Sequence, residues 1–308
     1  PWGGPWGVRG GVCAFEIKGS ELVRTLTVLS LMAMTGAATA VPMPDPAGLA
    51  GLQVVEIDVP DEAVVDLLLE SGLDGLACRP APGLSPWVVS EDDLSLIESL
   101  GLDHHALIAD LESHQAAQNA ARQAARLSAR GLDPFYADFR TYDEYMARID
   151  QFLIDHADIA TGINIGQSHE GRDIRGVVIN VDGTEKPACL FNGCQHAREW
   201  ISPPTTWYIA DTLADQYGVD PQITALLDRV EVVVIPIINP DGYEHTYAPG
   251  GYRFWRKNRR VNGGSCDGVD LNRNWGSDWN GGQSTSTDPC SDVYVGPASM
   301  SEPEVQAL

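Results

Sequence analysis

The stretch VEVVVIPIINPDG at residues 230–242 decides the fold of this chain. Residues 230–238 are almost entirely apolar, and their run has the length of a β-strand. Such a continuous run is typical of a strand in a sheet that is covered on both faces. The segment Asn239-Pro240-Asp241-Gly242 that follows consists of turn-forming residues. We therefore expect a buried strand that ends in a turn.

Helical and strand patterns alternate around this stretch. Two more apolar runs of strand length cover residues 174–181 and 188–192. Helices are expected at residues 142–157, 202–218 and 220–228. Strands that alternate with helices indicate an α/β fold. For residues 133–308 the sequence therefore predicts a mixed, mostly buried sheet with helices on both faces.

A smaller unit precedes this region. Residues 41–51 are rich in proline and glycine and are typical of a linker. Across residues 52–111, alternating strands and two short amphipathic helices follow the order β-α-β-β-α-β. That order is typical of an α+β, ferredoxin-like module. We expect such a module over residues 41–111.

An alanine-rich helix is expected between the two units, at residues 112–132. Arg122, Arg126 and Arg130 share one face of it because they are four residues apart. One interpretation is a solvated face. The alternative is an exposed site for an activating, trypsin-like protease.

The N-terminus has the pattern of an exported protein. Residues 23–40 contain an arginine, an apolar stretch and an A-x-A site, which are typical of a secretory signal peptide. A short buried helix is the alternative. Residues 1–22 are rich in glycine and tryptophan, and we interpret them as a non-native or unordered extension. The sequence thus predicts a secreted protein, extracellular or periplasmic.

The amino-acid composition limits the classes of binding partner that are expected for this protein. The 308 residues are 44% hydrophobic and 20% charged, with a formal net charge of −23. An acidic surface repels nucleic acid and anionic lipid. The chain has no run of about 20 apolar residues, so no membrane span is expected. Five cations nevertheless fall within residues 253–260. Inside an acidic region they favour recognition of a local anion over binding of nucleic acid.

The clearest chemical pattern is His196-x-x-Glu199, directly after the expected strand 188–192. Side chains at the carboxyl end of a strand lie where open α/β sheets bind ligands. An imidazole and a carboxylate make up part of a catalytic zinc site, which has three protein ligands and one open position. The spacing alone is weak evidence, because such pairs also arise by chance.

Four motifs in order give this pair its context. They are HAREW at 196–200, NPDGY at 239–243, RFWRKNR at 253–259 and DLNRNW at 270–275. Together they resemble the zinc carboxypeptidases of the carboxypeptidase A/B type, over residues 133–308. The resemblance implies an α/β metallocarboxypeptidase that uses one catalytic Zn²⁺ to release C-terminal amino acids from peptides. Residues 52–111 also resemble that family's activation segment.

The resemblance also implies roles for single residues. His196 and Glu199 match two of three zinc ligands, and Arg256 matches the arginine that polarises the scissile carbonyl. Asn272 and Arg273 match the pair that binds the substrate's C-terminal carboxylate, which suits a guanidinium fork. Arg198 is similar to a substrate-binding arginine further out. Taken singly, Arg256 and Arg273 could instead be surface cations and Asn272 a turn residue.

The family's third zinc ligand is a histidine that comes after the position of Arg273, followed by a general-base glutamate. No histidine occurs after His245 in this chain. We therefore expect a truncated proenzyme that is inactive by itself and binds zinc weakly. The alternatives are a carboxylate-binding pseudo-enzyme of the same fold and a zinc amidase on cell-wall peptides.

Four cysteines complete the expectations. The resemblance implies a disulfide between Cys266 and Cys290. Cys189 and Cys194 are five positions apart around a strand end, and this odd spacing sends their side chains to opposite faces and argues against a mutual disulfide. Both are expected to be buried thiols, with Cys194 as a metal ligand the alternative.

Overall fold

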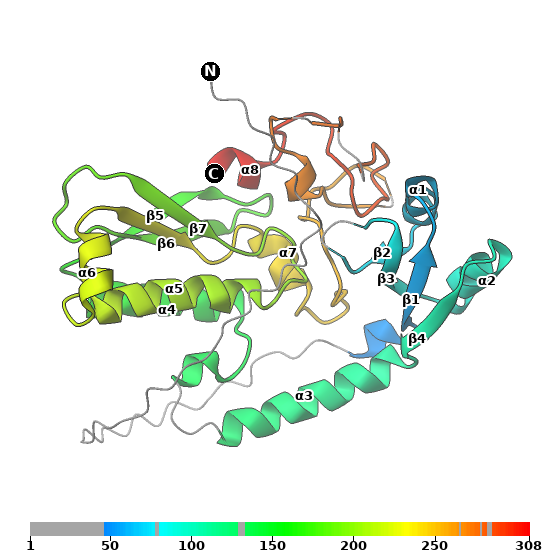
Figure 1. Cartoon of the computed structure of the whole chain (residues 1–308), viewed down its shortest axis with the longest axis horizontal. Coiled ribbons are helices and arrows are strands. Elements are labelled where there is room, and N and C mark those ends of the chain that lie inside the picture. Colours follow the sequence, from blue (N-terminus) through cyan, green and yellow to red (C-terminus); the bar gives the residue numbers. More distant parts are fainter. Residues whose placement is uncertain (1–45, 78–79, 129–132, 265, 278, 282–284) are drawn as a thin grey trace. The chain divides into compact units, whose positions relative to one another are not determined.

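The computed structural model describes residues 46–308, apart from 78–79, 129–132, 265, 278 and 282–284. The expected extension (1–22) and signal peptide (23–40) lie outside the described residues. Two four-stranded sheets organise the part that is described (Figure 1). None of its helices combines the length and the apolar character needed to cross a membrane.

The first sheet has the strand order β2-β3-β1-β4, with antiparallel pairs throughout. Two helices connect its strands, which confirms the predicted ferredoxin-like order. Val55, Ile57 and Val59 alternate with more exposed residues along β1 and are buried against these helices. The bounds are β1 (Gln53–Val59), α1 (Glu62–Glu70), β2 (Asp74–Gly75), β3 (Gly83–Val89), α2 (Glu91–Ser99) and β4 (His104–Ile108). We call residues 46–111 the N-terminal module.

The predicted linker at 41–51 is not wholly a linker. Pro46–Leu49 form a 3-10 turn, and Leu49 is fully buried against Val54, Val88 and Leu111. The turn fixes the start of the module because the Leu49 side chain packs into this apolar cluster.

The structure has a helix α3 (Leu111–Ser128) where the connecting helix is expected, and the last expected residues, 129–132, lie outside the described residues. Arg122, however, does not lie on a solvated face. Its Nε donates to Asp138 Oδ1 at 2.6 Å, and its guanidinium lies over the rings of Phe139 and Trp200. The side chains of Arg126 and Arg130 lie outside the described part of the chain.

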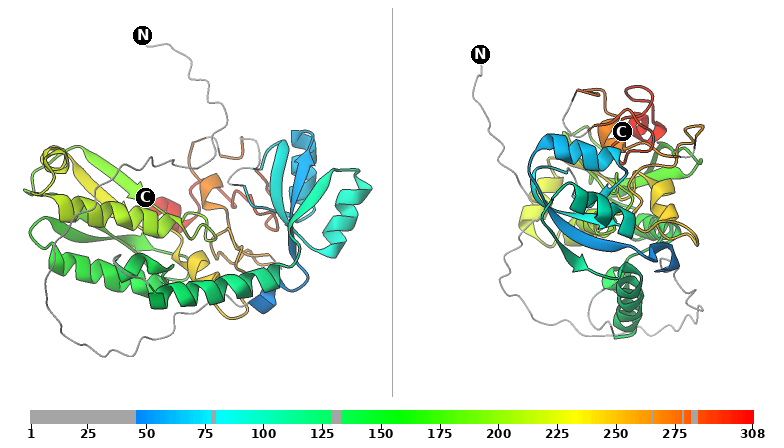
Figure 2. Two further views of the ribbon diagram at one scale, coloured as in Figure 1. Left: turned by 60° about the horizontal axis from the view of Figure 1, so that its bottom comes forward. Right: turned by 90° about the vertical axis from the view of Figure 1, so that its right-hand side faces the viewer.

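The second sheet is mixed, as predicted. Its order is β5-β6-β8-β7, and only β7 and β8, among these four strands, run parallel. Helices α4 and α5 pack on one face, and α8 packs on the other (Figures 1 and 2). The bounds are α4 (Tyr142–Asp155), β5 (Ala160–Gln167), β6 (Asp173–Ile179), β7 (Ala188–Asn192), α5 (Ser202–Gln216), α6 (Pro221–Leu227), β8 (Glu231–Ile235), α7 (Pro240–His245) and α8 (Pro303–Ala307).

Strand β7 differs from the expectation of a buried strand. It lies at the sheet edge with β8 as its neighbour, and Leu190 is 47% exposed. Cys189 is exposed too, so the prediction that it is a buried thiol is wrong. An edge strand has a neighbour on one side only, and an apolar sequence cannot reveal which strands lie at an edge.

The parallel pair β7–β8 positions the candidate site. Because the two strands run parallel, their carboxyl ends meet at the same edge of the sheet. The loop 193–201 leaves β7 there, and residues 236–239 leave β8. The hydrogen bonds from Gly193 N to Ile235 O and from Ile238 N to Gly193 O hold these two exits together. His196 and Asn239 are therefore brought side by side.

Candidate functional site

His196 lies in the loop after β7 with its imidazole buried between two carboxylates. Its Nδ1 is 2.9 Å from Glu199 Oε1, and its Nε2 is 3.1 Å from Asp270 Oδ1. Glu199 is partly exposed, whereas Asp270 is completely buried. The ring is thus fixed on one side by a buried carboxylate and faces a more accessible carboxylate on the other.

Arg256 completes the buried part of this cluster. Its Nε and Nη2 donate to Asp270 Oδ2 at 3.1 and 2.9 Å. Burial alone would raise the pKa of Asp270, but Arg256 and His196 lower it far below its ordinary range. Asp270 is therefore an anion that ties the imidazole of His196 to the guanidinium of Arg256.

A buried amide holds the segments that carry these groups. Nδ2 of Asn239 donates to Gln195 O and to Lys257 O, each at 3.0 Å, and its Oδ1 accepts from Gly242 N. A Cβ at Gly242 would come within 2.5 Å of Lys257 O. Because Lys257 follows Arg256, the amide fixes the spacing between the His196 loop and the Arg256 segment.

Asn272 and Arg273 follow Asp270 in the 3-10 turn Leu271–Arg273. The Asn272 backbone N–H donates to Asp270 Oδ1 at 2.9 Å, so the buried carboxylate also shapes this turn. The Asn272 side chain is exposed and Arg273 is half-buried. The structure therefore brings the two predicted carboxylate-binding residues next to the His196–Arg256 cluster.

Arg198 is engaged elsewhere. Its guanidinium forms an ion pair with Asp74 of β2 and donates to Gly75 O at 2.6 Å. A longer contact of 3.4 Å reaches Asp292 Oδ2. The side chain predicted to bind substrate thus contacts the N-terminal module.

The five cations of residues 253–260 each have a partner within the protein. Charged groups inside a fold are stable only when paired or hydrogen-bonded, and this run supplies such cations to its own surroundings. Their partners are the Trp200 ring and Arg198 O for Arg253, Asp270 for Arg256, two carbonyl groups for Lys257, Glu170, Asp267 and the Trp255 ring for Arg259, and Glu302 for Arg260.

Two buried carboxylates next to the site were not predicted from the sequence. Glu302 Oε2 and Glu304 Oε2 accept from the same donor, Asn258 Nδ2, at 2.8 and 3.1 Å. Both side chains are completely buried. Burial and the neighbouring Glu302 raise the pKa of Glu304 to about 7. This pair anchors the segment before α8 to the residues that follow Arg256.

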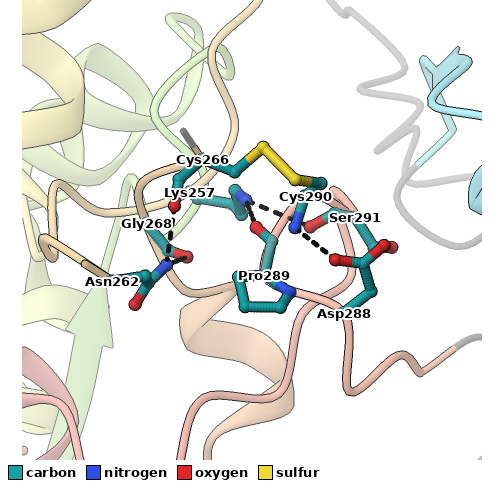
Figure 3. Close-up of a disulfide and its surroundings, with 8 residues drawn as sticks. All are labelled: Lys257, Asn262, Cys266, Gly268, Asp288, Pro289, Cys290 and Ser291. Atoms are coloured by element: carbon teal, nitrogen blue, oxygen red, sulfur yellow. Dashed lines mark hydrogen bonds between the residues drawn. A yellow bond between two sulfur atoms is a disulfide. The ribbon is translucent and has the colours of Figure 1, made fainter. Parts of the chain in front are cut away.

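The predicted disulfide is confirmed between Cys266 and Cys290, with Cα atoms 4.9 Å apart (Figure 3). Buried Lys257 lies beside it and donates from Nζ to Pro289 O at 2.7 Å and to Ser291 O at 3.1 Å. Burial lowers the pKa of Lys257. The disulfide and this lysine fix the loop that carries Asp292.

Replacing both Cys266 and Cys290 with serine is expected to lower the free energy of unfolding by about 3 kcal/mol, because the cross-link closes a loop of 24 residues. Urea unfolding under non-reducing conditions measures this. The control is Cys189→Ser, which alters an exposed thiol and should leave the unfolding midpoint unchanged. Equal midpoints for the double variant and the parent would contradict the expectation.

The prediction that Cys194 is a buried thiol holds, and its metal-ligand alternative loses support. Its Sγ lies 3.7 Å from His196 O, and burial raises the pKa of the thiol well above its usual value. A thiol that stays protonated is a poor ligand. Cys194 has a φ of 58°, in the left-handed region, which turns the chain from β7 toward His196.

The donor set fits part of a zinc site. Nε2 of His196 is hydrogen-bonded to Asp270, so Nδ1 is the ring nitrogen that faces the Glu199 carboxylate. One imidazole nitrogen and one carboxylate oxygen are ligands that Zn²⁺ accepts, and an orienting carboxylate on the far ring nitrogen is usual in such sites. Within the described residues, no group of three or more His, Cys, Asp or Glu side chains could hold a metal.

Comparisons with known proteins agree with this chemistry. The family model described as zinc carboxypeptidase matches residues 145–308. Carboxypeptidase A5 of Homo sapiens is 33% identical over 273 residues, which is 84% of this chain and 62% of the relative. A metallocarboxypeptidase A-like protein of Trichophyton verrucosum is 41% identical over 177 residues, 57% of this chain and 40% of the relative.

Solved structures extend the likeness to the fold. Carboxypeptidase A of Helicoverpa armigera superposes with a TM-score of 0.73 at 26% identity, and covers 84% of this chain and 65% of its own. Thrombin activatable fibrinolysis inhibitor gives 0.69 at 25% identity, with 83% and 66% covered. The chain thus spans less than two thirds of the length of these curated relatives and solved structures.

Proposed function

This chain belongs to the zinc carboxypeptidase family, and from that premise we propose that the protein releases C-terminal amino acids from peptides and proteins. The observation that carries the proposal is the continuous contact from Glu199 through His196 and Asp270 to Arg256. It joins a metal-binding pair to a buried cation, which is what hydrolysis of an amide needs.

In this proposal His196, through Nδ1, and Glu199 would hold the zinc ion. When bound, zinc would supply an activated water and polarise the substrate carbonyl. Asp270 fixes the orientation of the imidazole and its tautomer, because it accepts a hydrogen bond from Nε2–H. The buried anion also prevents rotation of the ring.

Arg256 stabilises the negative charge that develops on the carbonyl oxygen. Its guanidinium is held in place by Asp270, so its orientation is set before substrate arrives. Asn272 and Arg273 bind the C-terminal carboxylate, Arg273 through paired N–H groups and Asn272 through its amide. Together they select a peptide end rather than an internal bond.

The proposal includes a secreted proenzyme. The N-terminal module would cover the site until a protease cuts within residues 112–132. The contact of Asp74 and Gly75 with Arg198 supports this, because it occupies an arginine assigned to substrate binding. The half-buried, paired state of Arg122 favours a cut elsewhere in the segment.

The test uses enzyme made from the whole reading frame of the gene and cleaved within residues 112–132. Release of the terminal amino acid is measured from an N-acylated dipeptide and from the same compound as its C-terminal amide. We expect hydrolysis of the free acid alone. Arg256→Ala should lower kcat about 10²- to 10³-fold with little change in KM. Arg229→Ala, at an exposed arginine, is the matched control.

Two outcomes would replace the proposal. Equal turnover of acid and amide would indicate an amidase that does not read a terminal carboxylate. Binding of the free acid without turnover, in zinc-loaded protein, would indicate a pseudo-enzyme.

A further inference from the structure

Asp74 lies where the N-terminal module meets the site loops. Its carboxylate forms an ion pair with Arg198, and its Oδ2 accepts from Tyr252 OH at 3.1 Å. The next residue, Gly75, accepts from Arg198 through its carbonyl oxygen. The Asp74 side chain is 14% exposed and that of Arg198 is 6% exposed. The partners of Asp74 thus come from outside the module.

A second carboxylate shares the same guanidinium. Asp292, from the loop closed by the disulfide, lies 3.4 Å from Arg198 Nη1. Arg198, Asp292 and Tyr252 are the titratable groups that face Asp74 from the segments packed against it. Lys257 also acts electrostatically on Asp292 but is bound to two carbonyl groups. One buried cation therefore pairs with two carboxylates, of which Asp74 is the more buried.

The surroundings are apolar. Val293, next to Asp292, is 2% exposed and packs into the module's core with Trp87 and Val65. Tyr252 and Phe254 pack against a neighbouring cluster that contains Leu49. Water is therefore largely excluded from Asp74 while the module is docked, and the Asp292 carboxylate, 28% exposed, lies beside it, which disfavours a negative charge on Asp74.

We propose that docking of the N-terminal module takes up one proton on Asp74, so that low pH favours the docked state and rising pH releases it. The linkage itself does not depend on catalysis. Only its consequence, a site uncovered as pH rises, rests on the proposed function.

The direction follows from the burial of Asp74. Desolvation, opposed by Arg198 and reinforced by Asp292, raises its pKa from 3.8 to about 7. In an undocked module these partners are absent and the ordinary value applies. The docked state therefore binds the extra proton between roughly pH 4 and pH 7, and docking weakens as the pH rises through that range.

The experiment measures opening in the 308-residue chain. Val293→Cys places a thiol at this buried contact. The alkylation rate of this thiol is measured by mass spectrometry on the peptide that contains it, under non-reducing conditions. This rate is divided by the alkylation rate of a free thiol peptide at the same pH. We expect the corrected rate to rise on the order of 50-fold from pH 5 to pH 8, as a shift of this size implies.

Asp74→Asn in this background mimics the protonated acid, so its thiol should stay protected at both pH values. Asp292→Asn leaves Arg198 to Asp74 alone, and the rise should become smaller. Asp58→Asn, an exposed acid of the same module, should behave as the parent. Three results would overturn the proposal. They are an alkylation rate of the parent that does not change with pH, a rise of the rate that persists in Asp74→Asn, and fast alkylation of Asp74→Asn at pH 5.

Urea unfolding of the chain without the new thiol gives a second readout. From pH 5 to pH 8 the parent should lose free energy of unfolding relative to Asp74→Asn, because the parent's docked state gives up its proton in this range. No change in the difference between the two chains would overturn the proposal even if the thiol variant fails to fold. Neither readout involves peptide hydrolysis, so failure of the proposed function would leave the proton linkage standing.

Discussion

Replacing Asp270 with alanine is expected to lower the free energy of unfolding by about 3–5 kcal/mol, the cost of leaving a buried ionic partner unpaired. Arg256 is 2% exposed and donates two hydrogen bonds to this carboxylate. Without it, the guanidinium and the His196 ring lose their shared partner. Urea unfolding at pH 7 measures the loss, and Asp58→Ala, at an exposed site, should cost less than about 0.5 kcal/mol.

Asp270→Asn separates charge from shape. The amide fills the same space, so stability should fall less than in the alanine variant. Zinc affinity should still fall about 10- to 100-fold, because the imidazole loses its orienting carboxylate. The pKa of Asp270 lies well below its ordinary range, so its stabilisation is present above about pH 4 and is lost only in strong acid. Unchanged zinc affinity in Asp270→Asn would contradict the assigned role.

Replacing Asn258 with alanine should also be strongly destabilising, and its cost should depend on pH. Asn258 Nδ2 is the shared donor for the buried carboxylates of Glu302 and Glu304. Loss of that donor should cost about 2–4 kcal/mol at pH 8 and less at pH 5. At pH 5 Glu304 is protonated, because its pKa is about 7, and its own O–H can then donate to Glu302.

The sign is set by Glu304. Its pKa in the fold is above the ordinary 4.5, so the fold binds a proton that the unfolded chain releases, and its contribution to stability falls as pH rises toward 7. Urea unfolding at both pH values tests this. Gln151→Ala, which removes an exposed amide, is the matched control. An Asn258→Ala cost that is equal at pH 5 and pH 8 would show that Glu304 does not titrate in this range.

Three of the four strands of the second sheet could be predicted because they follow from local apolar runs, whereas β5 (Ala160–Gln167) was missed. The run at 230–238 is apolar on both faces and becomes the strand β8. The same reasoning failed for Ala188–Asn192, which is apolar but lies at the sheet edge. Position within a sheet depends on which strands pair, and pairing is not encoded in the apolar run itself. Leu49 was missed because one apolar residue among prolines gives no period.

The candidate site divides in a similar way. His196, Glu199, Arg256, Asn272 and Arg273 lie in recognisable motifs, and the structure places them close together. Asp270 was overlooked although it begins a motif, because its partners His196 and Arg256 are 74 and 14 residues away. No motif in the sequence around Asp74 indicates that its side chain pairs with Arg198. The internal partners of the cations at 253–260 could not be predicted, because a run of cations does not show which groups lie beside it in the fold.

The three hydrogen bonds of Asn239 have a consequence for protein engineering. Its amide connects backbone atoms of three separate stretches, beside His196, after Arg256 and at the start of α7. Grafting HAREW alone onto another scaffold would transfer the two ligands without the support that spaces them. A transferable site is therefore the set of three stretches, and a library that randomises one of them should keep the other two fixed.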